Sequence, residues 1–235
     1  MQQRELAATT PSDSLISILG SEDATTCHII VLRHTGSGAT CLAHCDGSDS
    51  ENEVAAIMQA VKSLTKTTEG RLELHMVGGF NDQQRLSLKL SRQLLKAFHK
   101  QAEDVHLVTL CVTDINNKKE NGINLPITYG IAVNVKTGEL SKAKFPDRQP
   151  DEDLRSAYVL TGGQVMCFTQ TYYSSLILQC FSTSPKAEPP DFVEHMKSSL
   201  KYLKDNPHNQ ISVFSKGKPR SYKKKADGQW ERIQN

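Results

Sequence analysis

At 235 residues the chain is long enough for one large domain or two small ones, and it can bury a core without metal or disulfide cross-links. Its 23% charged and 37% apolar residues exclude a fully disordered chain, and a net charge of +2 is too small to draw nucleic acid or anionic lipid to the whole surface. The six cysteines form no CxxC pair, and the first residues lack the apolar run of a secretory signal, so we expect a soluble protein with reduced thiols.

The first half of the chain predicts strands followed by helices. Short β-rich runs cover residues 14–19, 27–34 and 39–45, and a Thr-Gly-Ser-Gly turn separates the last two. Apolar residues at helical spacing then predict an amphipathic helix over 52–64. Residues 72–80 read as a buried strand that ends in a glycine turn.

The second half continues this alternation. A second helix is predicted from Leu86 to Phe98, and residues 104–114 read as another buried strand. Residues 127–145 predict two strands joined at Lys136-Thr137-Gly138, with glycine where positive φ is tolerated.

Residues 151–160 predict a short helix, whereas 164–181 show neither helical period nor clean alternation. A Pro-Pro start and an apolar face predict the last long helix, over 187–203, and short strands follow around Val213 and Trp230. No repeat or linker divides the chain, so one domain over 1–235 is the simpler expectation. We therefore expect an α/β fold, an α+β sandwich of mixed or antiparallel sheets flanked by helices.

One pair of residues points to chemistry. If 27–34 and 39–45 form an antiparallel hairpin that turns at Thr35-Gly36, Cys27 lies directly opposite His44. Directly opposed β-carbons are about 4.5–5.5 Å apart, so the imidazole could take the thiol proton. A slip of one residue would put the two side chains on opposite faces. The simpler interpretation is that Cys27 is a small core residue and His44 a satisfied strand residue.

The surroundings of this pair favour the chemical interpretation. Ser21, six residues before Cys27, could orient the imidazole as the third member of a triad, or it could be an ordinary turn residue. Backbone N–H groups near Thr26 and Cys27 could hold an oxyanion where the loop joins the strand.

The segments LGSEDATTCHIIVLRHTGSGATCLAHCDG, VGGF, LVTLCVTD and YGIAVNVKTGEL together resemble the protein N-terminal asparagine amidohydrolases. The resemblance runs from near the start to about Gly163 and resumes from Ser182. The spacing of Ser21, Cys27 and His44 is also similar to that of the bacterial chemoreceptor glutamine deamidases, which share a thiol-dependent α/β sandwich.

The resemblance implies hydrolysis of the side-chain amide of an N-terminal asparagine, in the degradation pathway that reads the N-terminal residue. It implies that Cys27 is the nucleophile, His44 the base and Ser21 the orienting residue. Two features depart from the family: its members begin several dozen residues earlier, and they have a longer acidic and aromatic stretch where this chain has 164–181. The chain then reads as an alternative isoform with a shortened N-terminus and an altered middle segment.

Other candidate sites have simpler explanations. The crowding of His28, His34, Cys41, His44 and Cys45 suggests zinc, but alternation along a strand sends neighbours to opposite faces. Gly78-Gly79 lacks the pattern of a phosphate loop and fits a strand-ending turn. The basic tail over 216–225 could contact nucleic acid, although a solvated hairpin explains it as well.

We therefore expect a cysteine-dependent amidohydrolase that forms a thioester and needs no cofactor or metal. Its partners would be proteins or peptides with N-terminal Asn, bound by a monomer in the cytoplasm and also in the nucleus, with no membrane or nucleic-acid partner. Glu188, with Asp46 as the second candidate, would bind the substrate α-ammonium, although Glu188 could instead serve as favourable charge at a helix N-terminus. The alternatives are a non-catalytic interaction module, an inactive isoform of this fold, or a different thiol hydrolase.

Overall fold

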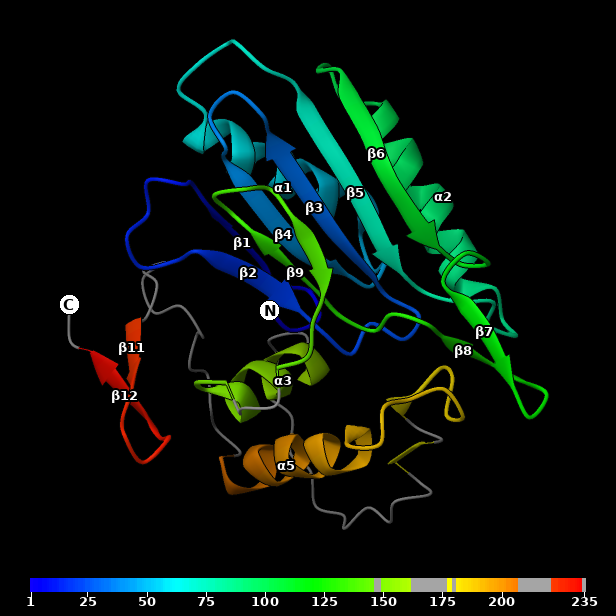
Figure 1. Ribbon diagram of the computed structural model, residues 1–235. Coiled ribbons are helices and arrows are strands. Elements are labelled where there is room, and N and C mark those ends of the chain that lie inside the picture. Colours follow the sequence, from blue (N-terminus) through cyan, green and yellow to red (C-terminus); the bar gives the residue numbers. More distant parts are fainter. Residues whose placement is uncertain (146–148, 162–176, 179–180, 207–220, 234–235) are drawn as a thin grey trace. The chain divides into compact units, whose positions relative to one another are not determined.

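The computed structural model describes residues 1–145, 149–161, 177–178, 181–206 and 221–233 (Figure 1). Its contacts separate two compact units. The first holds Met1–Phe145 with Thr183–Pro189, and the second holds Pro146–Ser182 with Pro190–Asn235. The single domain expected from the sequence stays a prediction.

A five-stranded mixed sheet organises the first unit. Its strands, in the order β1-β4-β3-β5-β6, are β1 (Leu6–Thr9), β4 (Thr40–Cys45), β3 (His28–His34), β5 (Leu72–Gly78) and β6 (Val105–Val112). Neighbours pair antiparallel except β5 and β6, which are parallel. The parallel pair needs a crossover, and helix α2 supplies it.

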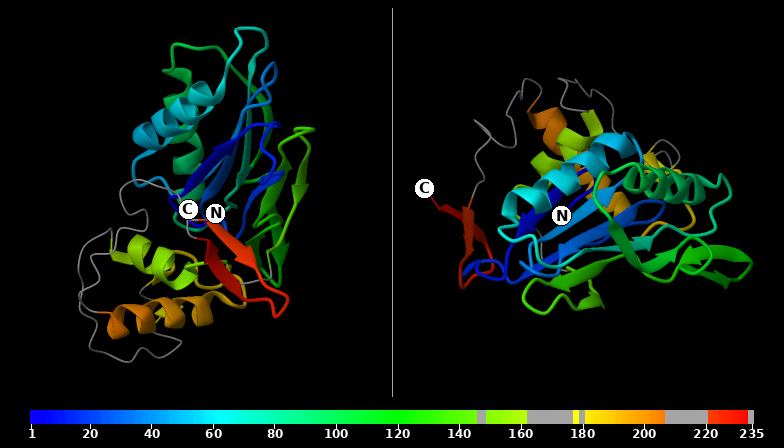
Figure 2. Two further views of the ribbon diagram at one scale, coloured as in Figure 1. Left: turned by 90° about the vertical axis from the view of Figure 1, so that its left-hand side faces the viewer. Right: turned by 90° about the horizontal axis from the view of Figure 1, so that it is seen from above.

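Two helices cover one face of this sheet: α1 (Ser50–Leu64) and α2 (Leu86–His99) (Figure 2). The Asp49 side chain accepts the backbone N–H of Asn52 and so caps α1. The apolar stripe predicted for the first helix, including Val54, Ile57 and Val61, is buried against the sheet. Removal of this apolar surface from water is the main force that holds the helices on the sheet.

A three-stranded antiparallel sheet covers part of the other face. Its order is β10-β9-β2, with β2 (Ile18–Ser21), β9 (Ile131–Asn134) and β10 (Leu140–Lys142). Val31 and Leu42 of the large sheet pack with Leu19 and Val133 of the small one in a second apolar cluster. The unit is therefore a sandwich with helices outside, which confirms the predicted α+β class with mixed and antiparallel sheets.

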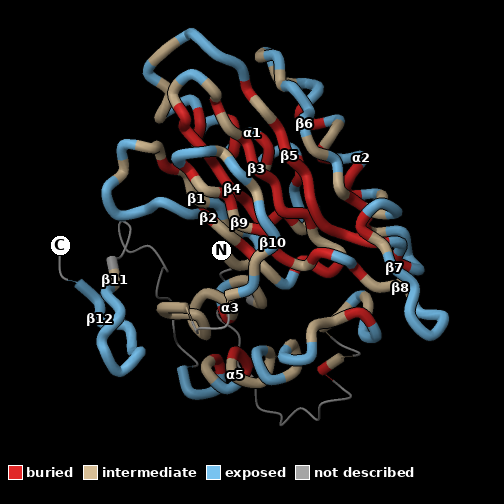
Figure 3. Tube along the Cα trace, viewed as in Figure 1, coloured by how far each residue is buried: buried red, intermediate tan, exposed pale blue. Residues whose placement is uncertain are grey.

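The sheets differ from the sequence prediction at four places. Strand β1 was not predicted, and the strand predicted over 14–19 is β2, which begins only at Ile18. The run over 104–114 was expected to be a buried strand, but β6 is an edge strand, and Leu107 and Val108 are 44% and 51% exposed (Figure 3). An antiparallel hairpin of β7 (Asn117–Glu120) and β8 (Ile123–Pro126) was not predicted at all.

The second unit contains α3 (Glu152–Thr161), α5 (Phe192–Asp205) and a hairpin of β11 (Ser221–Lys224) and β12 (Trp230–Ile233). Helices α3 and α5 pack together, and the Tyr222 hydroxyl donates a hydrogen bond to the Asp151 carboxylate. These elements confirm both late helices and the strand at Trp230. Val213 and most of 164–181 lie outside the described residues. Among the helices that the structure describes, none has the length and apolar character needed to cross a membrane.

Candidate active site

Cys27 lies in the loop that leads directly into β3, and the predicted register around it is wrong by two residues. In the structure Ile29, not Cys27, pairs with His44, and His28 pairs with Cys45. The turn is longer than expected, since Gly38 N–H bonds the His34 carbonyl at 2.8 Å and Gly38 adopts a φ of +69°. A shift of two preserves the alternation, so by register Cys27 falls on the sheet face that carries Ile29 and His44, and it packs against the apolar cluster of that face.

Ser21 and His44 come together as predicted. Ser21 Oγ lies 2.8 Å from His44 Nδ1 and 2.7 Å from the Met1 carbonyl, to which it donates its single hydroxyl proton. His44 Nδ1 then carries the proton of the shared bond, which leaves the lone pair on Nε2. Nε2 is buried and has no hydrogen-bond partner among the described residues. The imidazole is thus oriented so that Nε2, its basic nitrogen, lies on the side of the ring away from Ser21.

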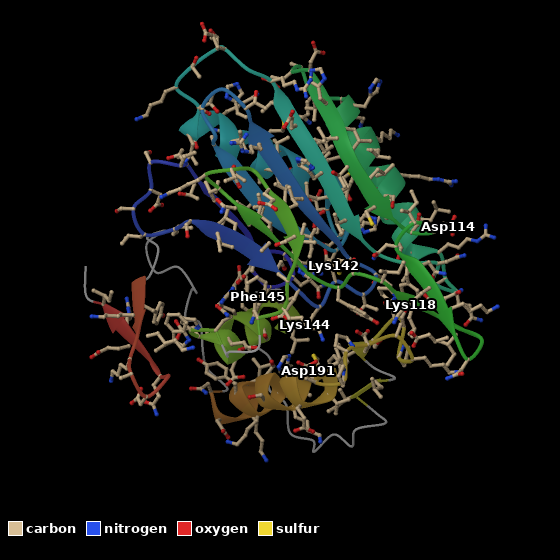
Figure 4. All side chains as sticks on the ribbon, viewed as in Figure 1. Asp114, Lys118, Lys142, Lys144, Phe145 and Asp191 are labelled. Carbon is tan, nitrogen blue, oxygen red and sulfur yellow. The ribbon has the colours of Figure 1, made fainter. Side chains whose placement is uncertain are left out.

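Phe145 of the first unit holds the backbone on both sides of Ser21. A Cβ on Gly20 would lie 2.1 Å from Phe145 Cζ, so a side chain at this position would displace the ring that packs on β2 (Figure 4). The Phe145 N–H also donates to Glu22 Oε2 at 2.9 Å. Residues on both sides of Ser21 are therefore held by Phe145.

Glu188 lies at the loop that precedes Cys27. Thr25 Oγ1 donates to Glu188 Oε2 at 2.8 Å, and Thr26 Oγ1 lies 3.4 Å from Thr183 Oγ1. Segment Thr183–Pro189 therefore returns to the loop across a sequence separation of more than 150 residues. The predicted ammonium-binding and oxyanion candidates, Glu188 and Thr26, are brought to the same loop.

Asp46 is already in an ion pair. Arg4 Nε and Gln3 Nε2 donate to Asp46 Oδ2 at 2.6 and 2.7 Å, and Ser48 N–H donates to Oδ1. Burial opposes ionisation, but these hydrogen bonds together lower the pKa of Asp46 to about 2. Its backbone N–H donates to Glu53 Oε1 at 3.3 Å, and burial followed by repulsion from Asp46 raises the pKa of Glu53 to about 7.

The thiol and the imidazole are both neutral at rest. Burial lowers the pKa of His44 to about 4. Burial, and then the negative charges of Asp46 and Glu188, raise the pKa of the Cys27 thiol above its ordinary value. A neutral thiol gives its proton to a neutral imidazole only when something stabilises the resulting thiolate.

The crowded histidines have separate partners. His28 Nε2 lies 2.6 Å from Ser91 Oγ, and His34 Nδ1 lies 3.0 Å from Ser37 Oγ. Cys41 and Cys45 belong to the apolar cluster beneath the helices, on the face opposite His44. No group of three or more His, Cys, Asp or Glu side chains suited to a metal ion occurs in the part of the chain that the structure describes.

Sequence reasoning missed four residues around this site: Gln3, Arg4, Glu53 and Phe145. Each reaches its partner across a loop or a different sheet, so no local spacing signals it. Glu53 alone has a sequence clue, since it lies in the first turn of a predicted helix, where a carboxylate is favourable.

The fold and site define an α+β protein in which a serine orients a histidine on the sheet face that also carries a cysteine, the combination expected of a thiol-type hydrolase. Comparison with known proteins is more specific. The sequence profile of the family described as protein N-terminal asparagine amidohydrolase matches residues 1–175 and 165–232. The chain belongs to this family.

The proteins of that name in Sus scrofa and Mus musculus are each 51% identical to the chain over 257 residues, covering 99% of it and 83% of the relative. The protein of the same name in Arabidopsis thaliana is 27% identical over 280 residues, covering 98% of the chain and 79% of the relative. The similarity therefore spans both units.

Proposed function

We propose that the chain hydrolyses the side-chain amide of an N-terminal asparagine in proteins or peptides, giving N-terminal aspartate and ammonia through a cysteine thioester. Family membership supports the substrate. The observation that carries the mechanism is the Ser21–His44 hydrogen bond, because it leaves a buried, unshared lone pair on Nε2 on the face that also carries Cys27.

The proposed reaction begins with transfer of the Cys27 proton to His44 Nε2, while Sγ attacks the asparagine side-chain carbonyl carbon. Backbone N–H groups near Thr26 and Cys27 hold the oxyanion. The imidazolium then protonates the amide nitrogen, the C–N bond breaks and ammonia leaves. Water, deprotonated by His44, attacks the thioester, which releases aspartate and restores the thiol. All atoms are accounted for without a cofactor or metal.

Of the two predicted ammonium ligands, Glu188 is the one that contacts the loop before Cys27. Asp46 is held by the Arg4 guanidinium at 2.6 Å, so its charge is already paired. The Glu188 carboxylate accepts a hydrogen bond from the Thr25 hydroxyl, which places it at the loop two residues before the nucleophile. A carboxylate at this point would select a free α-ammonium through a charge-assisted hydrogen bond.

The cellular setting follows from the same proposal. The product aspartate would feed the degradation pathway that reads the N-terminal residue, and the reduced cysteines favour the cytoplasm, with the nucleus as a second compartment. We propose that the enzyme acts as a monomer, because Ser21, Cys27 and His44 all lie within the first unit.

Four matched peptides test the activity: one beginning with Asn, one beginning with Gln, one N-acetylated and one with internal Asn. Each deamidation adds about one dalton by mass spectrometry. The Asn-initial peptide is expected to react. The Gln-initial peptide should react poorly, because an extra methylene in a tight pocket typically costs about 1–3 kcal/mol of binding free energy. The N-acetylated and internal-Asn peptides should also react poorly, because neither has an α-ammonium beside the asparagine side chain. Equal rates on free and acetylated peptides would reject ammonium recognition.

The same assay separates the rival functions. Folded protein that converts none of the four peptides, yet binds the Asn-initial one, would favour a non-catalytic module or an inactive isoform. Conversion of internal amides at the rate of N-terminal Asn would favour a different thiol hydrolase.

A further inference from the structure

The Gly78-Gly79 turn packs directly against the nucleophile's backbone. A Cβ on Gly78 would lie 2.6 Å from the Cys27 carbonyl oxygen, and a Cβ on Gly79 would lie 2.7 Å from His28 Cε1. Both glycines have positive φ, +129° and +62°, which side-chain-bearing residues rarely adopt. Gly78 therefore approaches the Cys27–His28 peptide, and Gly79 approaches the His28 ring, with left-handed backbone conformations that favour glycine.

His28 anchors the same peptide to helix α2. Its Nε2 lies 2.6 Å from Ser91 Oγ, and Ser91 Oγ donates its hydroxyl proton to the Ser87 carbonyl at 3.0 Å. Nε2 must then be the donor, so the ring is fixed as one neutral tautomer. Burial lowers the pKa of His28 to about 4, so the ring stays neutral at neutral pH.

The start of helix α2, to which His28 is bonded through Ser91, is itself held by hydrogen bonds. Asp82 accepts the N–H groups of Leu86 and Ser87 at 2.9 Å each, which fixes the start of α2. Ser87 Oγ accepts the Phe80 N–H at 3.2 Å, and Asn116 Nδ2 donates to the Gly79 carbonyl at 2.7 Å. The turn, the helix start and the His28 ring thus form one hydrogen-bonded unit behind Cys27.

We infer that His28, Ser91 and the Gly78-Gly79 turn are positioning residues that hold the Cys27 peptide, and with it the thiol and the N–H groups around it, in the geometry that the reaction needs. This inference rests on the proposed function. Effects of this kind appear in turnover, because misplacement of a nucleophile by about 1 Å can lower rates by about 100-fold.

The first test removes the Ser91 hydroxyl. Ser199 is a matched control, because it is buried in α5 and makes the same bond to the carbonyl four residues back, from Ser199 Oγ to His195 O. We expect Ser91→Ala to lower kcat about 10- to 100-fold with little change in KM, and Ser199→Ala to change kcat by less than about threefold. Thermal unfolding of both variants measures the stability cost separately.

The second test uses glycines of similar backbone conformation. Gly79 and Gly122 have φ values of +62° and +80°, but nothing lies within 4 Å of a Cβ on Gly122. Gly79→Ala should lower kcat, whereas Gly122→Ala should carry only the local backbone strain. His28→Gln, which keeps a donor for Ser91, should retain more turnover than His28→Leu.

Amide hydrogen exchange of the segment 25–29 gives a readout that does not need turnover. Exchange should be faster in Ser91→Ala than in Ser199→Ala. Unchanged kcat and unchanged exchange in Ser91→Ala and Gly79→Ala would overturn the inference while leaving the proposed function intact. Wild-type protein without deamidase activity would reject the proposed function, and the exchange comparison would still decide whether these residues hold the Cys27 peptide.

Discussion

His44 is the residue whose protonation state decides the proposed chemistry. Its Nδ1 is bonded to Ser21 and its pKa is lowered to about 4 by burial, so the ring is a neutral base throughout the physiological range. We predict that His44→Ala lowers kcat by roughly 10²–10⁴, the usual contribution of a positioned acid–base group. Ammonia release measures this effect. Alkylation of Cys27 should slow as well, and identical alkylation rates across neutral pH in both proteins would show that His44 does not activate the thiol.

Replacement of Glu188 is predicted to have opposite effects on two reactions, alkylation of the thiol and deamidation of the substrate. Its negative charge raises the pKa of Cys27, and in the proposed function it also binds the substrate ammonium. Glu188→Gln should therefore speed alkylation of the free enzyme by a small neutral reagent, because more thiolate is present at a given pH. The same change should lower kcat/KM for an Asn-initial peptide. Slower alkylation together with slower deamidation would indicate a disturbed loop instead.

At the level of elements, helix α1 carries two first-turn carboxylates whose pKa values shift in opposite directions. Burial and Asp46 raise the pKa of Glu53 to about 7, whereas the ion pair with Lys100 lowers that of Glu51. The folded state then holds a proton on Glu53 that the unfolded state loses at about 4.5, so stability from this group is present below that pH and is lost as pH rises through 7.

We predict that Glu53→Gln raises the melting temperature at pH 8 relative to wild type, and that this advantage shrinks as pH falls toward 5. The matched change Glu51→Gln should lower the melting temperature at pH 8 or leave it unchanged, since it removes a favourable exposed pair. Thermal unfolding at several pH values measures both. A pH-independent effect of Glu53→Gln would contradict the raised pKa.

Sequence alone predicted most elements but not all of their pairings. The helical period of Val54, Ile57 and Val61 was sufficient for α1 because periodicity is a local property. The prediction that β6 is buried was wrong because the exposure of a strand depends on whether another strand lies beside it, and β6 is at the sheet edge. The β7–β8 hairpin was missed because β7 is polar, although Asn121-Gly122 is a strong turn signal.

Sequence predicted only part of the site, because alternation along a strand is a local property whereas contacts between distant elements are not. Ser21 and His44 were paired correctly, and Cys27 was placed on the correct face because a two-residue slip keeps the alternation. The Arg4–Asp46 ion pair and the His28–Ser91 bond join residues 42 and 63 positions apart. Such contacts depend on the packing of whole elements, and no spacing in the sequence encodes them.

For the whole molecule, the central claim is that one of its thiols carries the reaction. Among the described cysteines, Cys41 and Cys45 face the helices in the apolar core, whereas Cys111 packs with Cys27 against the second cluster. Cys111 is therefore the most stringent control, since it shares a sheet face with the proposed nucleophile.

The most direct measurement is ammonia release from an Asn-initial peptide by wild-type protein and by the four variants Cys27→Ala, Cys41→Ala, Cys45→Ala and Cys111→Ala. We predict no turnover for Cys27→Ala, and turnover within about tenfold of wild type for the other three once their folding is verified by thermal unfolding. Substantial ammonia release by folded Cys27→Ala protein would contradict the thioester mechanism.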